Sequence, residues 1–246
     1  MVRAFGYVVA VGFAALALAA CSPGGPVLGD EKKSAEWVKK ELLAAETQGG
    51  ATGEMFAALR AAEPEIYAKF VDAATRKVAA GQTTQEAGFA AGAEVRPLYL
   101  ERFIALSRTA ADADINELLD YSGDQMQALM EIDPKLCVTV AMGGTDPRVQ
   151  QLPQAMLERE MRVMARMIRA GQQDGAGAAP DELNTWIEKF ASEYPAAIEG
   201  LTMMDTPAPD SAQATTICQS NIAMTEALAK EEPATRARLF RALLQS

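Results

Sequence analysis

The spacing of the apolar residues is the feature that most restricts the fold of this chain. From residue 31 to residue 244, Leu, Met, Ile, Val and Phe recur three or four positions apart, in stretches separated by Gly, Pro and short polar turns. This spacing gathers apolar side chains on one side of an α-helix, whereas a half-buried strand needs strict alternation. Long alternating runs of Val, Ile, Thr and Tyr are absent from the sequence. We therefore expect an all-α fold, a compact bundle of about eight to ten helices.

Helix boundaries are predicted from start and stop signals. The first helix is expected from about Glu31 to Thr47, ahead of Gly49-Gly50, and the most regular one from about Pro153 to Ala170. Thr83 with Glu86, and Asp114 with Glu117, match the capping-box pattern. The Leu-Cys-Val-Thr-Val segment, residues 136–140, is expected to be helical, although its composition would also suit a strand.

Two prolines and one glycine-rich segment are expected to interrupt this pattern. Pro97 should kink or break a helix near Arg96, and Pro195 should bend another. Residues 171–179 are expected to form a flexible loop, because they contain three glycines and no helical spacing of apolar residues.

The N-terminus carries an export signal. A single positive charge, Arg3, precedes an apolar run from Val8 to Leu18, and small residues follow directly. This order is typical of a secretory signal peptide, and the run is shorter than the roughly 20 residues that span a bilayer. We assign residues 1–20 to a signal peptide, residues 21–30 to a tether, and residues 31–246 to a single α-helical domain.

The end of this signal, Leu18-Ala19-Ala20-Cys21, resembles the lipobox of bacterial lipoproteins. The resemblance implies that diacylglycerol is attached to Cys21, that the chain is cleaved before this residue, and that the new amino group is acylated, for example with palmitate. Two or three acyl chains anchor a protein stably to a membrane. Ser22 follows the cysteine, which in a Gram-negative host implies sorting to the outer membrane, facing the periplasm.

The charge of the chain limits its partners. The sequence has 33 acidic and 23 basic residues, and loss of Arg3 with the signal leaves 22 basic residues and a net charge of −11. This charge argues against nucleic acid and against an anionic membrane surface as binding partners, because both attract basic patches.

The absence of histidine limits the chemistry. It excludes Ser-His and Cys-His nucleophiles, histidine zinc sites and histidine general bases. Phosphate-binding glycine loops, dinucleotide fingerprints and the G-x-S-x-G motif are also absent from the sequence. We assign no catalytic residue and no cofactor.

Two weak metal patterns have simpler interpretations. Met161, Met164 and Met167 recur every third residue, as soft copper ligands would, but methionines also fill helical cores. Asp112, Asp114 and Asn116 match the opening of a calcium loop, but the loop's sixth and twelfth positions do not match. We assign no metal site.

Cys137 and Cys218 remain for the folded domain once Cys21 is lipidated. An even pair in an oxidising compartment favours a disulfide. Two free buried thiols, or a metal or redox role, are the alternatives.

The segment from Asp112 to Asp133 is a candidate interaction surface, with seven acidic residues and no basic one. Glu117, Asp120 and Asp124 fall on one side of a helix and are expected to dock an electropositive partner. The ordinary alternative is a solvated helix face.

The function favoured by these observations is a lipid-anchored, periplasm-facing helical module that binds a protein partner or has a structural role, for example an inhibitor of a basic toxin. The alternatives are a carboxylate-based hydrolase of cell-wall glycan, which needs two carboxylates around its substrate, and a helical pocket for a small apolar ligand.

Overall fold

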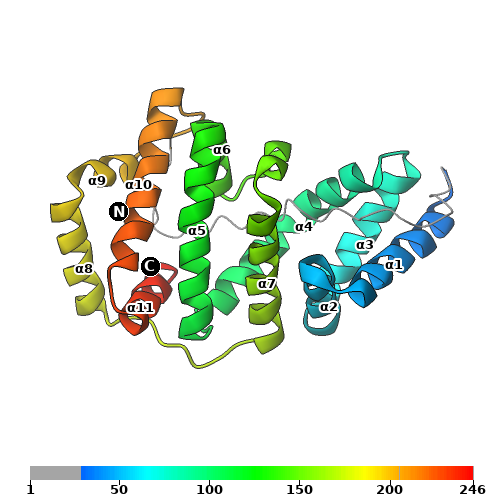
Figure 1. Ribbon diagram of the computed structural model, residues 1–246, viewed down its shortest axis with the longest axis horizontal. Helices are drawn as coiled ribbons and strands as arrows, with labels where there is room; N and C mark the ends of the chain where they lie inside the picture. Colours follow the sequence, from blue (N-terminus) through cyan, green and yellow to red (C-terminus); the bar gives the residue numbers. More distant parts are fainter. Residues whose placement is uncertain (1–28, 205, 246) are drawn as a thin grey trace. The chain divides into compact units, whose positions relative to one another are not determined.

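The computed structural model describes residues 29–204 and 206–245, which form eleven α-helices and one short 3-10 helix (Figure 1). The helices are α1 (Glu31–Gln48), α2 (Gly50–Ala62), α3 (Pro64–Ala79), α4 (Thr84–Ser107), α5 (Asp112–Ile132), α6 (Pro134–Ala141), α7 (Gln154–Ala170), α8 (Pro180–Glu193), α9 (Pro195–Thr202), α10 (Ser211–Ala229) and α11 (Pro233–Leu243). The 3-10 helix, Pro147–Gln151, precedes α7. The described residues contain no strand, and residues 136–140 lie in α6. The all-α class is confirmed.

The described chain divides into two compact units. Unit 1 comprises residues 104–156 and 172–245, and unit 2 comprises residues 29–103 and 157–171. Helices α4 and α7 contribute residues to both. The single domain expected over residues 31–246 stays a prediction.

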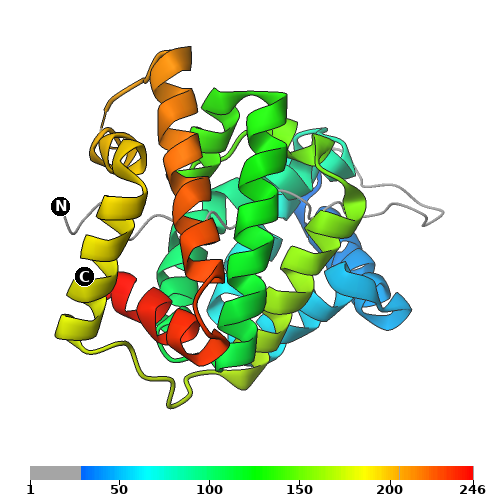
Figure 2. The ribbon, with the colours of Figure 1, turned by 60° about the vertical axis from the view of Figure 1, so that its left-hand side comes forward.

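Unit 1 is built around helices α5 and α10. Helix α5 packs against α6, α10 and α11, and α10 also packs against α9; Figures 1 and 2 show α5 and α10 side by side. The crossing of α9 and α10 depends on Gly200, where a Cβ atom would overlap Ser220 Oγ and lie 2.5 Å from the backbone oxygen of Thr216. A residue without a side chain is therefore required for this close approach.

Unit 2 begins with three mutually packed helices, α1, α2 and α3. Their core contains Val38, Leu42, Phe56, Phe70 and Val78, all buried. The rings of Phe56 and Phe70 lie 5.2 Å apart between centroids, a usual distance for an aromatic pair.

The number of helices exceeds the expected eight to ten because prolines start new helices. Pro195 was expected to bend one helix, but it begins α9, after Tyr194 leaves the helical region with φ −128° and ψ 58°. A residue before proline disfavours the α conformation, so the segment from residue 180 to residue 202 forms two helices.

Of the kink or break expected at Pro97, the break is wrong, and the kink stays a prediction. Helix α4 continues through this proline from Thr84 to Ser107. Pro97 is exposed, and a proline frees the carbonyl four residues earlier. On the outer side of a helix, water can satisfy that carbonyl.

One of the two expected capping boxes is confirmed. The Thr83 amide donates to Glu86 Oε2 at 2.9 Å, and the Glu86 amide donates to Thr83 Oγ1 at 3.3 Å. The box at Asp114 and Glu117 is wrong, because α5 already begins at Asp112 and has no side-chain cap.

The loop between α7 and α8, expected to be flexible, is tied to unit 1 by backbone hydrogen bonds. The Gly175 amide donates to the Thr109 carbonyl at 3.0 Å, and the Ala178 amide donates to the Arg238 carbonyl at 2.9 Å. A Cβ atom at Gly175 would lie 2.5 Å from the Ala110 carbonyl oxygen. This glycine thus lets the loop lie directly against the start of α5.

Candidate functional site

The proposed lipidation site, Cys21, lies outside the described residues, as does the segment from residue 1 to residue 20. Its modification stays a prediction. Within the described residues, no helix is long and apolar enough to cross a membrane.

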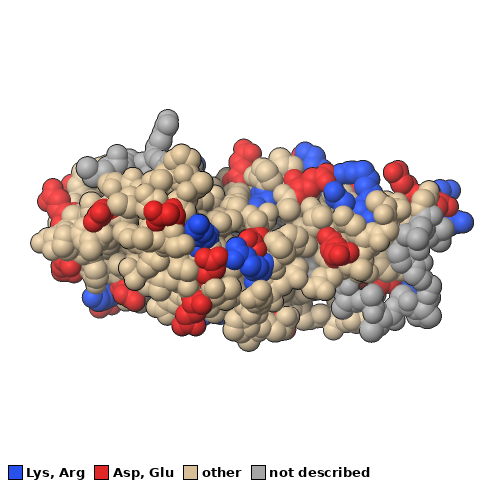
Figure 3. All heavy atoms as spheres, turned by 90° about the horizontal axis from the view of Figure 1, so that it is seen from above, with Lys and Arg blue, Asp and Glu red and all other residues tan. Residues whose placement is uncertain are grey.

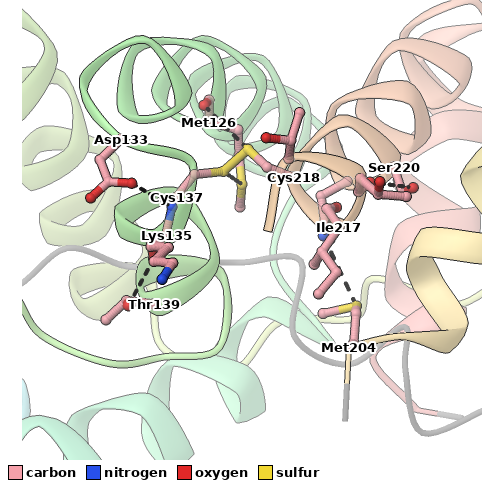
Figure 4. The surroundings of a disulfide bond; sticks show 12 residues. Met126, Asp133, Lys135, Cys137, Thr139, Met204, Ile217, Cys218 and Ser220 are labelled. Carbon is pink, nitrogen blue, oxygen red and sulfur yellow. Dashed lines mark hydrogen bonds between the residues drawn. A yellow bond between two sulfur atoms is a disulfide. The ribbon is translucent and has the colours of Figure 1, made fainter. Parts of the chain in front are cut away.

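The predicted disulfide is present in unit 1, where Cys137 of α6 is bonded to Cys218 of α10 (Figure 4). Their Cα atoms lie 6.1 Å apart, and both residues are buried. Met126 of α5 lies against the bridge, with its Sδ atom 3.7 Å from Cys137 Sγ and its carbonyl oxygen 3.8 Å from Cys218 Sγ. The bridge therefore joins α6 to α10 where both contact α5.

The acidic segment of α5 is partly neutralised by arginines of unit 1. Asp120 Oδ1 lies 2.9 Å from Arg236 Nη1, and the same arginine donates to Asn116 Oδ1 at 2.6 Å. At the start of α5, Asp112 accepts a 2.6 Å hydrogen bond from Arg241. Helix α11, which packs on α5, thus supplies charges that complement the acidic helix.

The three predicted docking residues are all engaged within the molecule. Asp120 pairs with Arg236, while Glu117, which is half-buried, and Asp124, which is exposed, also take part in interactions within the chain. Their role in docking stays a prediction. Because they have internal partners, reversing their charge would disturb the fold as well as any binding.

Arg241 is the most deeply buried charged side chain of unit 1, with 1 % of its side chain exposed. Besides Asp112, it donates to the carbonyl oxygen of Ala110 through Nε at 3.1 Å and through Nη2, and to that of Ala176 through Nη1 at 3.1 Å. The guanidinium thereby holds α11, the start of α5 and the loop before α8 together.

At the end of the acidic segment, Arg148 pairs with two carboxylates. Arg148 lies 2.6 Å from Asp133 and 2.8 Å from Asp146. Hydrogen bonds from Arg148 hold the pKa of both carboxyl groups below the ordinary value, and the two carboxylates raise the pKa of Arg148.

The two units differ sharply in charge. Over residues 104–156 and 172–246 the sequence has 19 acidic and 8 basic residues, a net charge of −11, whereas residues 29–103 and 157–171 have 14 of each. The whole excess of negative charge therefore belongs to unit 1. In Figure 3, acidic side chains outnumber basic ones at the left-hand end, where Figure 1 places α8, α9 and α10.

Most basic residues of unit 1 are already used inside it. Seven of the eight form an ion pair or a hydrogen bond within the unit: Arg108, Arg148, Lys189, Lys230, Arg236, Arg238 and Arg241. In contrast, Glu131, Glu188 and Glu199 are exposed, and no ion pair involves them in the described part of the chain. The acidic surface of unit 1 is therefore available to a positively charged partner.

Sequence reasoning did not find a buried polar cluster in unit 2. Arg96 and Tyr99 of α4 and Glu160 of α7 are all buried. Burial lowers the pKa of Arg96, which Glu160 partly offsets, and burial raises the pKa of Tyr99. The feature of the sequence that could have revealed this cluster is Glu160, which falls on the apolar side of its helix, three residues after Leu157.

The three methionines of the copper pattern lie in the core of unit 2. Met161, Met164 and Met167 are buried in unit 2, and Met161 Sδ accepts a 3.6 Å hydrogen bond from Thr52. Over the part of the chain that the structure describes, no group of three or more Cys, Asp or Glu side chains is arranged to hold a metal ion.

Five carboxyl groups of the described residues have a lowered pKa. In each of them hydrogen bonding lowers the pKa: Asp30, Glu65, Glu86, Asp133 and Asp146. A general acid usually has a raised pKa instead.

Comparison of the chain with protein-family models, with curated proteins and with solved structures gives no match.

Proposed function

We propose that this chain is a lipoprotein anchored through Cys21, facing the periplasm from the outer membrane of a Gram-negative host, and that unit 1 docks an electropositive protein. The observation that carries the docking proposal is the division of charge, −11 on unit 1 against zero on unit 2. A surface with one dominant sign of charge accelerates encounter with a partner of opposite sign and disfavours wrong partners.

The anchor is tested by metabolic labelling with palmitate. The wild-type protein is expected to incorporate the label and to partition into detergent, whereas C21A should remain an unlabelled precursor. An unlabelled wild-type protein in the soluble periplasmic fraction would refute the anchor.

Docking is tested by two charge-reversal variants with the same net charge. The first carries E131K, E188K and E199K in unit 1, and the matched control carries E36K, D72K and E101K in unit 2. All six positions are exposed, and single exposed charges contribute roughly 0 to 1 kcal/mol to folding. Any difference between the variants therefore reports on the unit that carries the change.

The measurement is affinity capture from envelope extracts at low and high salt, with the captured proteins identified by mass spectrometry. The unit 1 variant is expected to lose basic partners that the wild type and the unit 2 variant both retain, and high salt should weaken their capture. The same captured proteins with both variants would exclude unit 1 as the docking unit.

A further inference from the structure

The outer side of α1 combines positive charge with an exposed apolar residue. Lys32, Lys39 and Lys40 are exposed, and Leu43 is the most exposed large apolar side chain among the described residues, at 48 %. Positions 32, 39 and 43 are spaced seven and four residues apart, so they lie on one side of the helix. Lys39 and Lys40 precede Leu43 by one helical turn.

Within the described residues, three of the four lysines of α1 are not held in ion pairs. Lys33, also exposed, lies 3.5 Å from Asp30. The other three lysines have no ion pair with any carboxylate of residues 29–204 and 206–245. The helix also contains four glutamates, so its net charge is zero. Glu41 is buried and Glu46 pairs with Arg60, whereas Glu31 and Glu36 are exposed, so three exposed lysines without an ion pair share the helix with two exposed glutamates.

The sequence places this helix close to the proposed anchor. Nine residues separate Cys21 from Glu31, where α1 begins. Even fully extended, they span at most about 30 Å. If Cys21 carries the lipid, α1 is the element whose distance from the membrane is most restricted.

We propose that the outer side of α1 binds anionic lipid headgroups, with its lysines on the phosphates and Leu43 in the headgroup region. The nearness of the membrane rests on the proposed anchor, but the chemistry of the surface does not. The net charge of the whole chain argued against an anionic membrane surface. The negative excess belongs to unit 1, whereas α1 itself has no net charge. Lysines near an anionic membrane each strengthen binding roughly fivefold.

The test uses the mature chain, residues 21–246, with C21S, so that no acyl chain contributes. Its flotation is measured with phosphatidylcholine vesicles and with vesicles that also contain phosphatidylglycerol, at low salt. Two variants of equal net charge are compared: K32Q, K39Q and K40Q in α1, and K69Q, K77Q and K135Q elsewhere. L43S is compared with L98S, because Leu98 is the other exposed large apolar residue, at 36 %.

The wild-type chain is expected to bind the anionic vesicles about tenfold more tightly than the neutral ones, given the fivefold effect of a single lysine and the opposing glutamates. The α1 lysine variant should lose this preference and the matched variant should keep it, while L43S should weaken binding more than L98S. Equal binding of the wild type to both vesicles, or equal losses in the two lysine variants, would overturn the proposal. Neither outcome bears on the anchor, which palmitate labelling tests separately.

Discussion

At the scale of single residues, Arg241 joins three parts of unit 1: α11, the start of α5 and the loop before α8. Its guanidinium donates to the buried carbonyl oxygen of Ala110, to the carbonyl oxygen of Ala176 and to the carboxylate of Asp112. In R241M these acceptors lose their donor inside the protein, at a cost of about 2–4 kcal/mol in the free energy of unfolding. Urea denaturation measures the loss. The matched variant R238M, which removes a partly exposed pair with Glu182, should cost about 1 kcal/mol or less. Equal losses in the two variants would contradict the stabilising role given to Arg241.

The ion pairs of Arg148 allow us to predict how the stability of unit 1 changes at low pH. It lowers the pKa of Asp133 and Asp146 in the folded protein. The stabilisation is therefore complete above the unfolded Asp pKa of about 3.9 and is lost as the pH falls through the lower folded values. R148Q should raise the pH midpoint of acid unfolding, followed by circular dichroism. An unchanged midpoint would show that these ion pairs do not contribute.

Residues differ in how far the sequence reveals their role. The bond between Cys137 and Cys218 was predictable, because a count of cysteines and the expected export to an oxidising compartment favour a single pairing. The pairing of Asp120 with Arg236 was not, because the two residues are 116 positions apart in the sequence. Arg241 was also missed, since an arginine in a short C-terminal helix has no local signal of burial.

At the scale of elements, the disulfide fixes α6 to α10 across 81 residues of chain. Closing a loop of this length in the unfolded state stabilises the fold by roughly 4.5 kcal/mol in the chain-entropy model. The double variant C137S/C218S should lose a large part of this stability in urea denaturation. Mass spectrometry of the native protein after alkylation should find neither thiol modified. Two alkylated thiols would refute the bridge.

Gly200 sets how closely α9 can approach α10. In G200A the new methyl group meets Ser220 Oγ and the Thr216 carbonyl, and overpacking of this kind costs about 1–3 kcal/mol. G123A is the control, because a Cβ atom there would come no closer than 3.2 Å to its nearest neighbour, Thr225 Oγ1. Thermal unfolding should rank G200A as the less stable of the two; the reverse order would contradict this close crossing.

The elements themselves were largely predictable, because helical spacing and glycine or proline boundaries are local signals. The first helix and the helix from residue 154 to residue 170 lie where the sequence placed them. The errors at Pro97 and Asp114 share one cause. Whether a proline is tolerated depends on its exposure, and α5 begins at Asp112, which accepts a hydrogen bond from the distant Arg241. Both facts depend on tertiary contacts.

At the scale of the molecule, the division into units changes the meaning of the net charge. A total of −11 describes an acidic protein, yet it combines an acidic unit 1 with a neutral unit 2. The sequence contains every charge but not the assignment of residues 157–171 to unit 2, which contributes four arginines. The division gives each unit its own expected partner, a basic protein for unit 1 and an anionic membrane for α1 of unit 2.

Photo-crosslinking in living cells tests this account most directly. A photoreactive amino acid is placed at position 188 or 199 of unit 1, or at position 72 or 101 of unit 2, all of which are exposed in the structure. The account predicts that positions 188 and 199 give crosslinks to a basic envelope protein, that positions 72 and 101 do not, and that high salt during labelling reduces the yield. Crosslinks to the same protein from unit 2 alone, or from both units with equal yield, would contradict it.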